Sequence, residues 1–344
     1  MRRSSSILAA ALSAATLAAP AASAQQFKTQ KFNIGGEGAF DYLSVDPTGR
    51  VFVSRSTHIM VVDGSSGKVL GDIPNTPRVH GAAFAPKWNH GFTTNGGDST
   101  STMFDLKTLA VLKKIPAGIN GLDGIMYDAS TDRILTIDHS KPGTAVVIDP
   151  SAGTVVTTIT LTGDAPEGGV GDGKGHIFIN LEDKHAIDVV DTKTWKVVNT
   201  WSIAPCEGPT GIAYDAKTNR IFSGCDDNSV VTDASTGKIV AHIPNGGSVD
   251  AIGWDASQKL LYIPSGDGNV TVARQDSPDA YTVVATVPTM RGARTIAIDE
   301  NKHVAYVFTP EYGPPPAGAT PPAGGRGRGP RGPIIGAWLI VITH

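Results

Sequence analysis

The chain has 344 residues, of which 40% are hydrophobic and 18% are charged, so it can bury a sizeable core and is not disordered throughout. Its 29 basic and 32 acidic side chains give a formal net charge of -3, which argues against a protein that coats nucleic acid. The 40 glycines and 23 prolines, with only 6% aromatic residues, are typical of many short strands joined by tight turns.

Residues 1–24 have the features of a signal peptide. Arg2 and Arg3 precede an apolar run, and Ala22-Ser23-Ala24 supplies the small residues at which a signal peptidase cleaves. The run is too short to cross a bilayer, and no other stretch reaches about 18 apolar residues. We therefore expect a periplasmic or secreted protein without a transmembrane segment, with residues 25–344 forming a single domain.

An aspartate that closes a short apolar strand recurs along the mature chain at intervals of 42 to 44 residues. Around it each unit repeats four short strands, the second of which reads Ile177-Phe178-Ile179 in one unit and Ile221-Phe222-Ser223 in the next. Four antiparallel strands in a period of about 42 residues are typical of one propeller blade. The recurring residues are Asp63, Asp105, Asp149, Asp191, Asp233 and Asp276.

The ends of the chain complete the count of blades. Residues 27–34 read as an unpaired fourth strand, and residues 338–342 as a third strand with no fourth after it. Pairing them completes a seventh blade and removes two exposed strand edges. The sequence therefore predicts an all-β, seven-bladed β-propeller of four-stranded antiparallel blades. A Pro/Gly/Arg-rich tract, residues 313–333, is predicted to be a loop inserted into the last blade.

Two motifs carry a family resemblance. Phe92-Thr93-Thr94-Asn95 is a variant of a Tyr-Val-Thr-Asn strand, and an Asp-x-x-Thr-Gly-Lys hairpin is present at residues 233–238. With these motifs the chain resembles the YVTN or YncE-like seven-bladed β-propeller family of exported bacterial proteins. The resemblance implies the fold and a periplasmic setting, and it implies no single reaction.

Most of the recurring carboxylates have a structural explanation. The six hairpin aspartates, and turns such as Asp128 to Arg133 and Asp215 to Arg220, are expected to accept backbone N–H bonds inside tight turns. Neither group is expected to bind a ligand.

A different phase of the repeat places polar side chains at the mouth of the central channel. Five residues before the end of each innermost strand, six of the seven residues are ionisable, and a small residue follows most of them. Small residues there let the inner strands approach the axis closely. The seven positions, which we call the mouth ring, are Asp41, His80, Asp123, Glu167, Thr210, Asp250 and Arg294.

The four carboxylates of the mouth ring repel one another, by about 2 kcal/mol for like charges roughly 8 Å apart at an effective dielectric constant of 20. A nearby positive charge would relieve this repulsion. A metal, a cationic ligand, or pairing of Arg294 with Asp250 and Asp41 could each supply it. His139, in a loop on the same face, joins His80 as a candidate for acid/base work. His80, Asp123 and Glu167 are the predicted ligands of a divalent metal ion, the only cofactor that the sequence suggests.

The two cysteines, Cys206 and Cys225, are predicted to form a disulfide. One precedes the innermost strand of the fifth blade and the other ends the antiparallel neighbour of that strand, so the two should meet in an oxidising compartment. Closing a loop of about 20 residues stabilises by roughly 3 kcal/mol in the chain-entropy model. A soft-metal pair is the alternative.

Three functions remain open at this stage. We expect a monomeric binding or scaffold protein whose loop-rich face and channel mouth bind a small-molecule ligand or an envelope protein. The alternative is a metal-assisted hydrolase, lactonase or lyase at the same mouth. The third is a purely structural envelope protein. Serine and cysteine nucleophile motifs are absent from the sequence, and the basic 313–333 tract is expected to be a linker-like excursion or a docking element.

Overall fold

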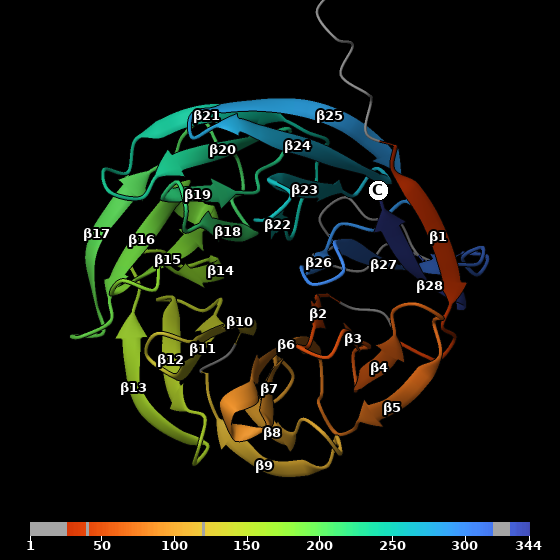
Figure 1. Cartoon of the computed structure of the whole chain (residues 1–344). Helices are drawn as coiled ribbons and strands as arrows, with labels where there is room; N and C mark the ends of the chain where they lie inside the picture. The colour runs from red at the N-terminus through yellow and green to blue at the C-terminus, as the bar shows by residue number, and fades with distance from the viewer. Residues whose placement is uncertain (1–25, 39–40, 119–120, 319–330) are drawn as a thin grey trace, which may run out of the picture.

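In the computed structural model, which describes residues 26–38, 41–118, 121–318 and 331–344, the chain folds into seven four-stranded antiparallel sheets. The sheets surround a central axis like blades (Figure 1). The prediction of a seven-bladed propeller is therefore confirmed. Among the described residues no helix is long and apolar enough to cross a membrane.

Each blade runs from an innermost strand at the axis to an outermost strand at the rim. Blades one to three comprise β2 (Leu43–Val45), β3 (Arg50–Ser54), β4 (Ile59–Asp63) and β5 (Val69–Ile73); β6 (Val79–Ala85), β7 (His90–Asn95), β8 (Thr100–Asp105) and β9 (Val111–Pro116); and β10 (Leu122–Asp128), β11 (Arg133–Asp138), β12 (Thr144–Asp149) and β13 (Thr154–Thr160). Single-turn 3-10 helices occupy Pro86–Trp88 and Glu182–Lys184.

Blades four to six follow the same order. They comprise β14 (Pro166–Gly171), β15 (His176–Leu181), β16 (Ala186–Asp191) and β17 (Lys196–Ser202); β18 (Ile212–Asp215), β19 (Arg220–Ser223), β20 (Asn228–Asp233) and β21 (Ile239–Pro244); and β22 (Gly253–Asp255), β23 (Leu260–Ser265), β24 (Asn269–Ser277) and β25 (Ala280–Pro288).

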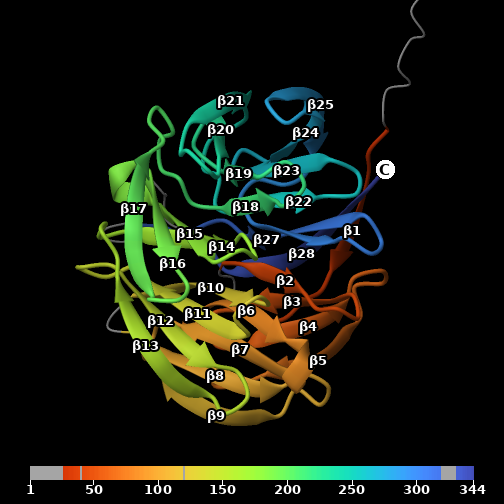
Figure 2. The ribbon, with the colours of Figure 1, turned by 60° about the vertical axis from the view of Figure 1, so that its left-hand side comes forward.

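The seventh blade is built from both ends of the chain, as the sequence predicts. Its order is β26 (Ile296–Asp299), β27 (Val304–Tyr312), β28 (Ile334–Thr343) and then β1 (Lys28–Asn33). The red β1 lies beside the violet-blue β28 in both views (Figures 1 and 2), with Lys28 opposite Thr343 and Asn33 opposite Trp338. This pairing closes the ring and leaves neither terminal strand with a free inner edge.

Apolar side chains between neighbouring blades form the core. Val53 of the first blade packs in one cluster with Tyr306 and Leu339 of the seventh, and all three are almost fully buried. Burying a side chain of this size contributes about 1.5–3 kcal/mol. Such clusters between blades fix the ring and hold the innermost strands around the axis.

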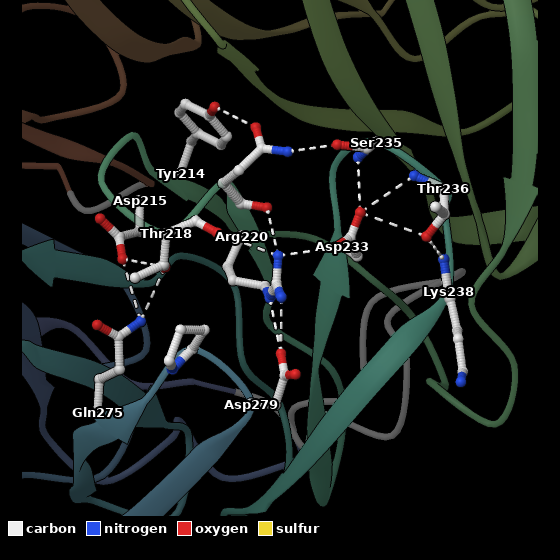
Figure 3. Close-up of polar contacts among 12 residues, drawn as sticks. Tyr214, Asp215, Thr218, Arg220, Asp233, Ser235, Thr236, Lys238, Gln275 and Asp279 are labelled. Atoms are coloured by element: carbon white, nitrogen blue, oxygen red, sulfur yellow. Dashed lines mark hydrogen bonds and ion pairs between the residues drawn. The ribbon is translucent and has the colours of Figure 1, made fainter.

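The hairpin face, where the third and fourth strands of each blade connect, uses its aspartates as predicted at five of the six positions. Asp233 accepts hydrogen bonds from the backbone N–H groups of Ser235 and Thr236, and also pairs with Arg220 at 2.8 Å (Figure 3). Arg220 also contacts Asp279 of the sixth blade at 2.8 Å and so ties two blades together. The exception is Asp276, which lies inside the longer β24 and bonds the side chains of Arg274 and Thr282.

The inserted tract has its expected position between β27 and β28. Residues 319–330, which include Arg326 and Arg328, lie outside the described residues, as does the predicted signal peptide. Cys206 and Cys225 form the predicted disulfide, with their Cα atoms 5.4 Å apart. An adjoining bridge between Glu207 and Asp226 continues this cross-link toward the channel mouth.

Candidate functional site at the channel mouth

The structure brings the whole mouth ring together around one cavity of about 730 Å³. The cavity is also lined by His139, which follows the end of β11. Because strands within a blade are antiparallel, the second strand ends on the face where the first begins, and this places His139 beside the ring. Thus every residue predicted for the site lies at a single opening.

Irregularities in strand pairing direct three of these side chains to the axis. The pairing of innermost and second strands shifts register between Val79 and Ala82, between Leu122 and Ile125, and between Pro166 and Gly169. Each shift falls on a mouth-ring residue and the glycine that follows it. A β-bulge bends its strand and re-aims a side chain, which accounts for the common direction of His80, Asp123 and Glu167.

The glycine after a mouth-ring residue is required by the neighbouring blade. A Cβ atom added at Gly124 would lie 2.5 Å from the carbonyl oxygen of Glu167, and one added at Gly211 would lie 2.5 Å from the amide nitrogen of Ile252. Both obstacles are backbone atoms, which cannot turn aside as a side chain can. The small residues therefore allow the inner strands to converge, as the sequence predicts.

His80 lies between two carboxylates from two other blades. Its Nδ1 atom is 2.7 Å from Oδ2 of Asp41 and 3.1 Å from Oδ1 of Asp123, and its side chain is only 8% exposed. Burial lowers the pKa of His80, but hydrogen bonds to Asp123 and Asp41 outweigh it and raise the pKa to about 9. His80 is therefore an imidazolium at neutral pH and supplies one of the cations that the acidic ring needs.

A second cluster lies on the other side of Asp123. His139 Nδ1 is 3.1 Å from Oε1 of Glu167, and the hydroxyl of Tyr42 donates a hydrogen bond of 3.3 Å to Oε2 of the same carboxylate. Burial raises the pKa of Glu167 to about 7, and the hydrogen bond that His139 donates to Glu167 raises the pKa of His139. The two groups thus place a possible proton donor and acceptor in direct contact, an arrangement that acid/base chemistry requires.

The third cluster is an ion pair between Arg294 Nη2 and Asp250 Oδ2 at 2.8 Å. Burial, and next the charge of Asp41, raise the pKa of Asp250 well above its ordinary value. The expected pairing of Arg294 with Asp250 is thus present, whereas Asp41 is held by His80. Thr210 differs from the other ring residues, because its hydroxyl donates to the backbone carbonyl of Val249.

The predicted metal ligands are divided between two groups. Asp123 belongs to one group with Asp41 and His80 and to another with His139 and Glu167, and within each group the potential ligand atoms lie within 4.8 Å of one another. His80 and Glu167 thus share Asp123 and are placed in different groups. A metal ion in the second group would have one nitrogen and two carboxylate ligands, a mixture suited to a borderline divalent ion.

The predicted site leaves out several residues of the cavity wall, among them Tyr42, Arg78, Glu182 and Asp226, although the sequence places Glu182 and Asp226 in loops on this face. Tyr42 had a detectable signal, because it stands where five of the other six blades have glycine or alanine after the ring residue. The other three lie in loops whose lengths differ between blades, so the repeat does not align them.

Comparisons with known proteins support the fold alone. No family model matches the sequence, and no curated protein is detectably similar to it. A chain of hydrazine synthase from Kuenenia stuttgartiensis is similar with a TM-score of 0.69 and 18% identity, covering 78% of this chain and 92% of that one. A chain in a crystal structure of the mitotic checkpoint complex has a TM-score of 0.71 and 14% identity, covering 88% and 95% respectively. Proteins with such different names share this architecture, so the fold alone does not identify the function of this chain. The residues at its channel mouth are the evidence that bears on function.

Proposed function

We propose that this protein is an exported binding protein that holds a small polar ligand in the cavity at its channel mouth. The observation that carries the proposal is the meeting of all seven mouth-ring residues around one cavity of about 730 Å³. That volume lies within the range of about 300–1,000 Å³ typical of small-molecule sites. The wall is mostly polar and charged, which favours a ligand that makes hydrogen bonds and ion pairs.

The three clusters explain how the carboxylates of the mouth are balanced by cationic side chains of the protein itself. His80, His139 and Arg294 each neutralise carboxylates beside them, at contact distances of 2.7 to 3.1 Å. A ligand would exchange some of these contacts for its own. Since the side chains come from several blades, each fixed by its own sheet, the site is largely pre-formed, which lowers the entropic cost of binding.

The proposed function is tested by thermal denaturation of the mature protein with amino acids, sugars, organic acids and divalent cations. At least one compound should raise the melting temperature, and Asp123→Asn should abolish that rise. Glu300→Gln, on the opposite face, is the matched control and should keep it. Binding at this mouth is wrong if no compound raises the melting temperature, or if every rise survives both Asp123→Asn and Glu167→Gln.

A metal-assisted hydrolase, lactonase or lyase is the second candidate, favoured by the group of Asp123, His139 and Glu167. A divalent ion there would polarise a carbonyl group or activate water. Metal analysis of the purified protein, with and without the paired changes Asp123→Ala and Glu167→Ala, tests it. Stoichiometric metal that disappears in the double variant supports the enzyme, whereas no metal and no thermal shift with any divalent ion excludes it.

Export and membership of the YVTN or YncE-like family are parts of the same proposal. The disulfide between Cys206 and Cys225 supports an oxidising compartment. The signal sequence predicts that the mature chain begins at Gln25, as a monomer in the periplasm or outside the cell. Amino-terminal sequencing of the exported protein checks the cleavage site, and an uncleaved chain retained in the cytoplasm would contradict it.

A further inference from the structure

A second cavity, of about 590 Å³, adjoins the first at the channel mouth. The two cavities share part of their walls, namely Asp41, Arg78, His80, Ser248 and Arg294. They therefore form one continuous opening with two compartments. The second compartment reaches toward the seventh blade and the base of the inserted tract.

The charges of the two compartments are opposite. Arg78, Arg291, Arg294 and Arg331 line the second compartment, and its only carboxylate among the described residues is Asp41, which is bonded to His80. The first compartment adds five carboxylates that the second lacks: Asp123, Glu167, Glu182, Asp226 and Asp250. A ligand that spans both compartments therefore meets arginines at one end and carboxylates at the other.

The base of the inserted tract helps to form the basic wall. Arg331 donates a hydrogen bond of 2.9 Å to the hydroxyl of Tyr312, and its guanidinium lies 4.7 Å from the centre of that ring. Arg291 comes from the segment between β25 and β26 and is exposed. Guanidinium groups stay protonated at neutral pH and bind oxyanions with paired hydrogen bonds. The chemistry of this wall thus fits a carboxylate or a phosphate.

We propose that the ligand is a zwitterion, with an oxyanion held in the arginine-lined compartment and a cationic group held among the carboxylates of the first. This inference rests on the proposed function and names the class of its ligand. A metal ion alone would match only the carboxylates of the first compartment, and an anion alone would match only the arginines of the second. A zwitterion uses both compartments.

The test uses calorimetric titration with three series of linear compounds. Each series covers chains of four to eight carbon atoms, and compounds of equal length are compared. The three series are ω-amino carboxylates, dicarboxylates and diamines, and aminoalkyl phosphates form a fourth series that distinguishes phosphate from carboxylate. The best amino carboxylate or aminoalkyl phosphate should bind at least tenfold more tightly than the dicarboxylate and the diamine of the same length.

Variants on exposed or half-exposed loops assign the two ends. Arg291→Gln should weaken the zwitterion and the dicarboxylate at least fivefold and leave the diamine unchanged. Glu182→Gln should weaken the zwitterion and the diamine and leave the dicarboxylate unchanged. Lys107→Gln and Glu300→Gln, on the opposite face, are the matched controls and should change none of them.

Two results would overturn the inference and leave the proposed function standing. One is equal or tighter binding of the diamine or dicarboxylate, and the other is zwitterion binding that neither Arg291→Gln nor Glu182→Gln weakens. Absence of binding by all four series at 10 mM also overturns it. The proposed function itself is contradicted only when none of the wider set of compounds raises the melting temperature in a way that requires Asp123 or Glu167.

Discussion

The two faces of this propeller use the same chemical group, the carboxylate, in opposite ways. On the hairpin face, hydroxyl and amide groups of the turn itself bond Asp63, Asp149 and Asp191, and those hydrogen bonds lower the pKa of each. At the channel mouth, burial raises the pKa of Glu167 and Asp250 instead. The position within the repeat, more than the residue type, therefore decides whether a carboxylate is structural or chemically available.

The physical difference lies in where the partners come from. A hairpin aspartate is satisfied by residues two or three positions later, such as Ser235 and Thr236 for Asp233. A mouth carboxylate depends on other blades, as Asp41 depends on His80 and Glu167 on Tyr42 across the channel. Local partners form with the turn, whereas distant partners exist only when the ring has closed.

The largest expected effect concerns His80. Its pKa is raised in the folded protein, so the stabilisation is complete below pH 6.5 and is lost as the pH rises from 6.5 through about 9. Over that window the wild-type free energy of unfolding should fall by about 3 kcal/mol more than that of His80→Gln. Urea denaturation at several pH values measures the difference, and parallel curves would contradict the assigned charge on His80.

The next effect concerns the ion pair at the mouth. Arg294→Ala leaves Asp250 buried without its cation, which we expect to cost about 2 kcal/mol at pH 8, less than for a fully buried pair because Arg294 is 31% exposed. The cost should shrink as the pH falls, because burial raises the pKa of Asp250 and favours its neutral form. Arg220→Ala on the hairpin face should cost about 1 kcal/mol and vary less with pH, because the turn still bonds Asp233. Equal pH dependence of the two variants would remove the contrast between the faces.

The smallest effect concerns the hairpin itself. Asp233→Ala removes the acceptor of the Ser235 and Thr236 N–H groups and one partner of Arg220, and should destabilise by about 1 kcal/mol. It should not change the binding of any compound at the mouth. Thermal denaturation and calorimetric titration check both parts, and weakened ligand binding would show that the faces are coupled.

The ring architecture could be predicted from the sequence because it is periodic. The spacing of Asp63, Asp105 and Asp149 counts blades directly, and the unpaired strands at the two ends indicate closure. The one hairpin aspartate that behaves differently, Asp276, lies in a blade whose third and fourth strands each extend over nine residues. There the turn begins after Ser277, so the periodic position no longer falls in it.

The candidate site could be predicted only in part from the sequence, and the reason is physical. The phase of the repeat identifies which residues face the axis, but the pairing of His80 with Asp41 and Asp123 depends on distances across the ring. Arg291 and Arg331 were missed as site residues because they lie in a connection and an insertion that do not repeat. These non-repeating segments contribute arginines to the second compartment, and that compartment distinguishes this mouth from a simple ring of carboxylates.

The most direct measurement is an NMR titration of the histidine ring nitrogens in the full-length mature protein, with His80→Gln used to assign the signal. We expect His80 to titrate near pH 9, and Asp41→Asn or Asp123→Asn to lower its pKa by at least one unit. A His80 that titrates near pH 6.5 and ignores both substitutions would show that the carboxylates of separate blades do not meet at the channel mouth.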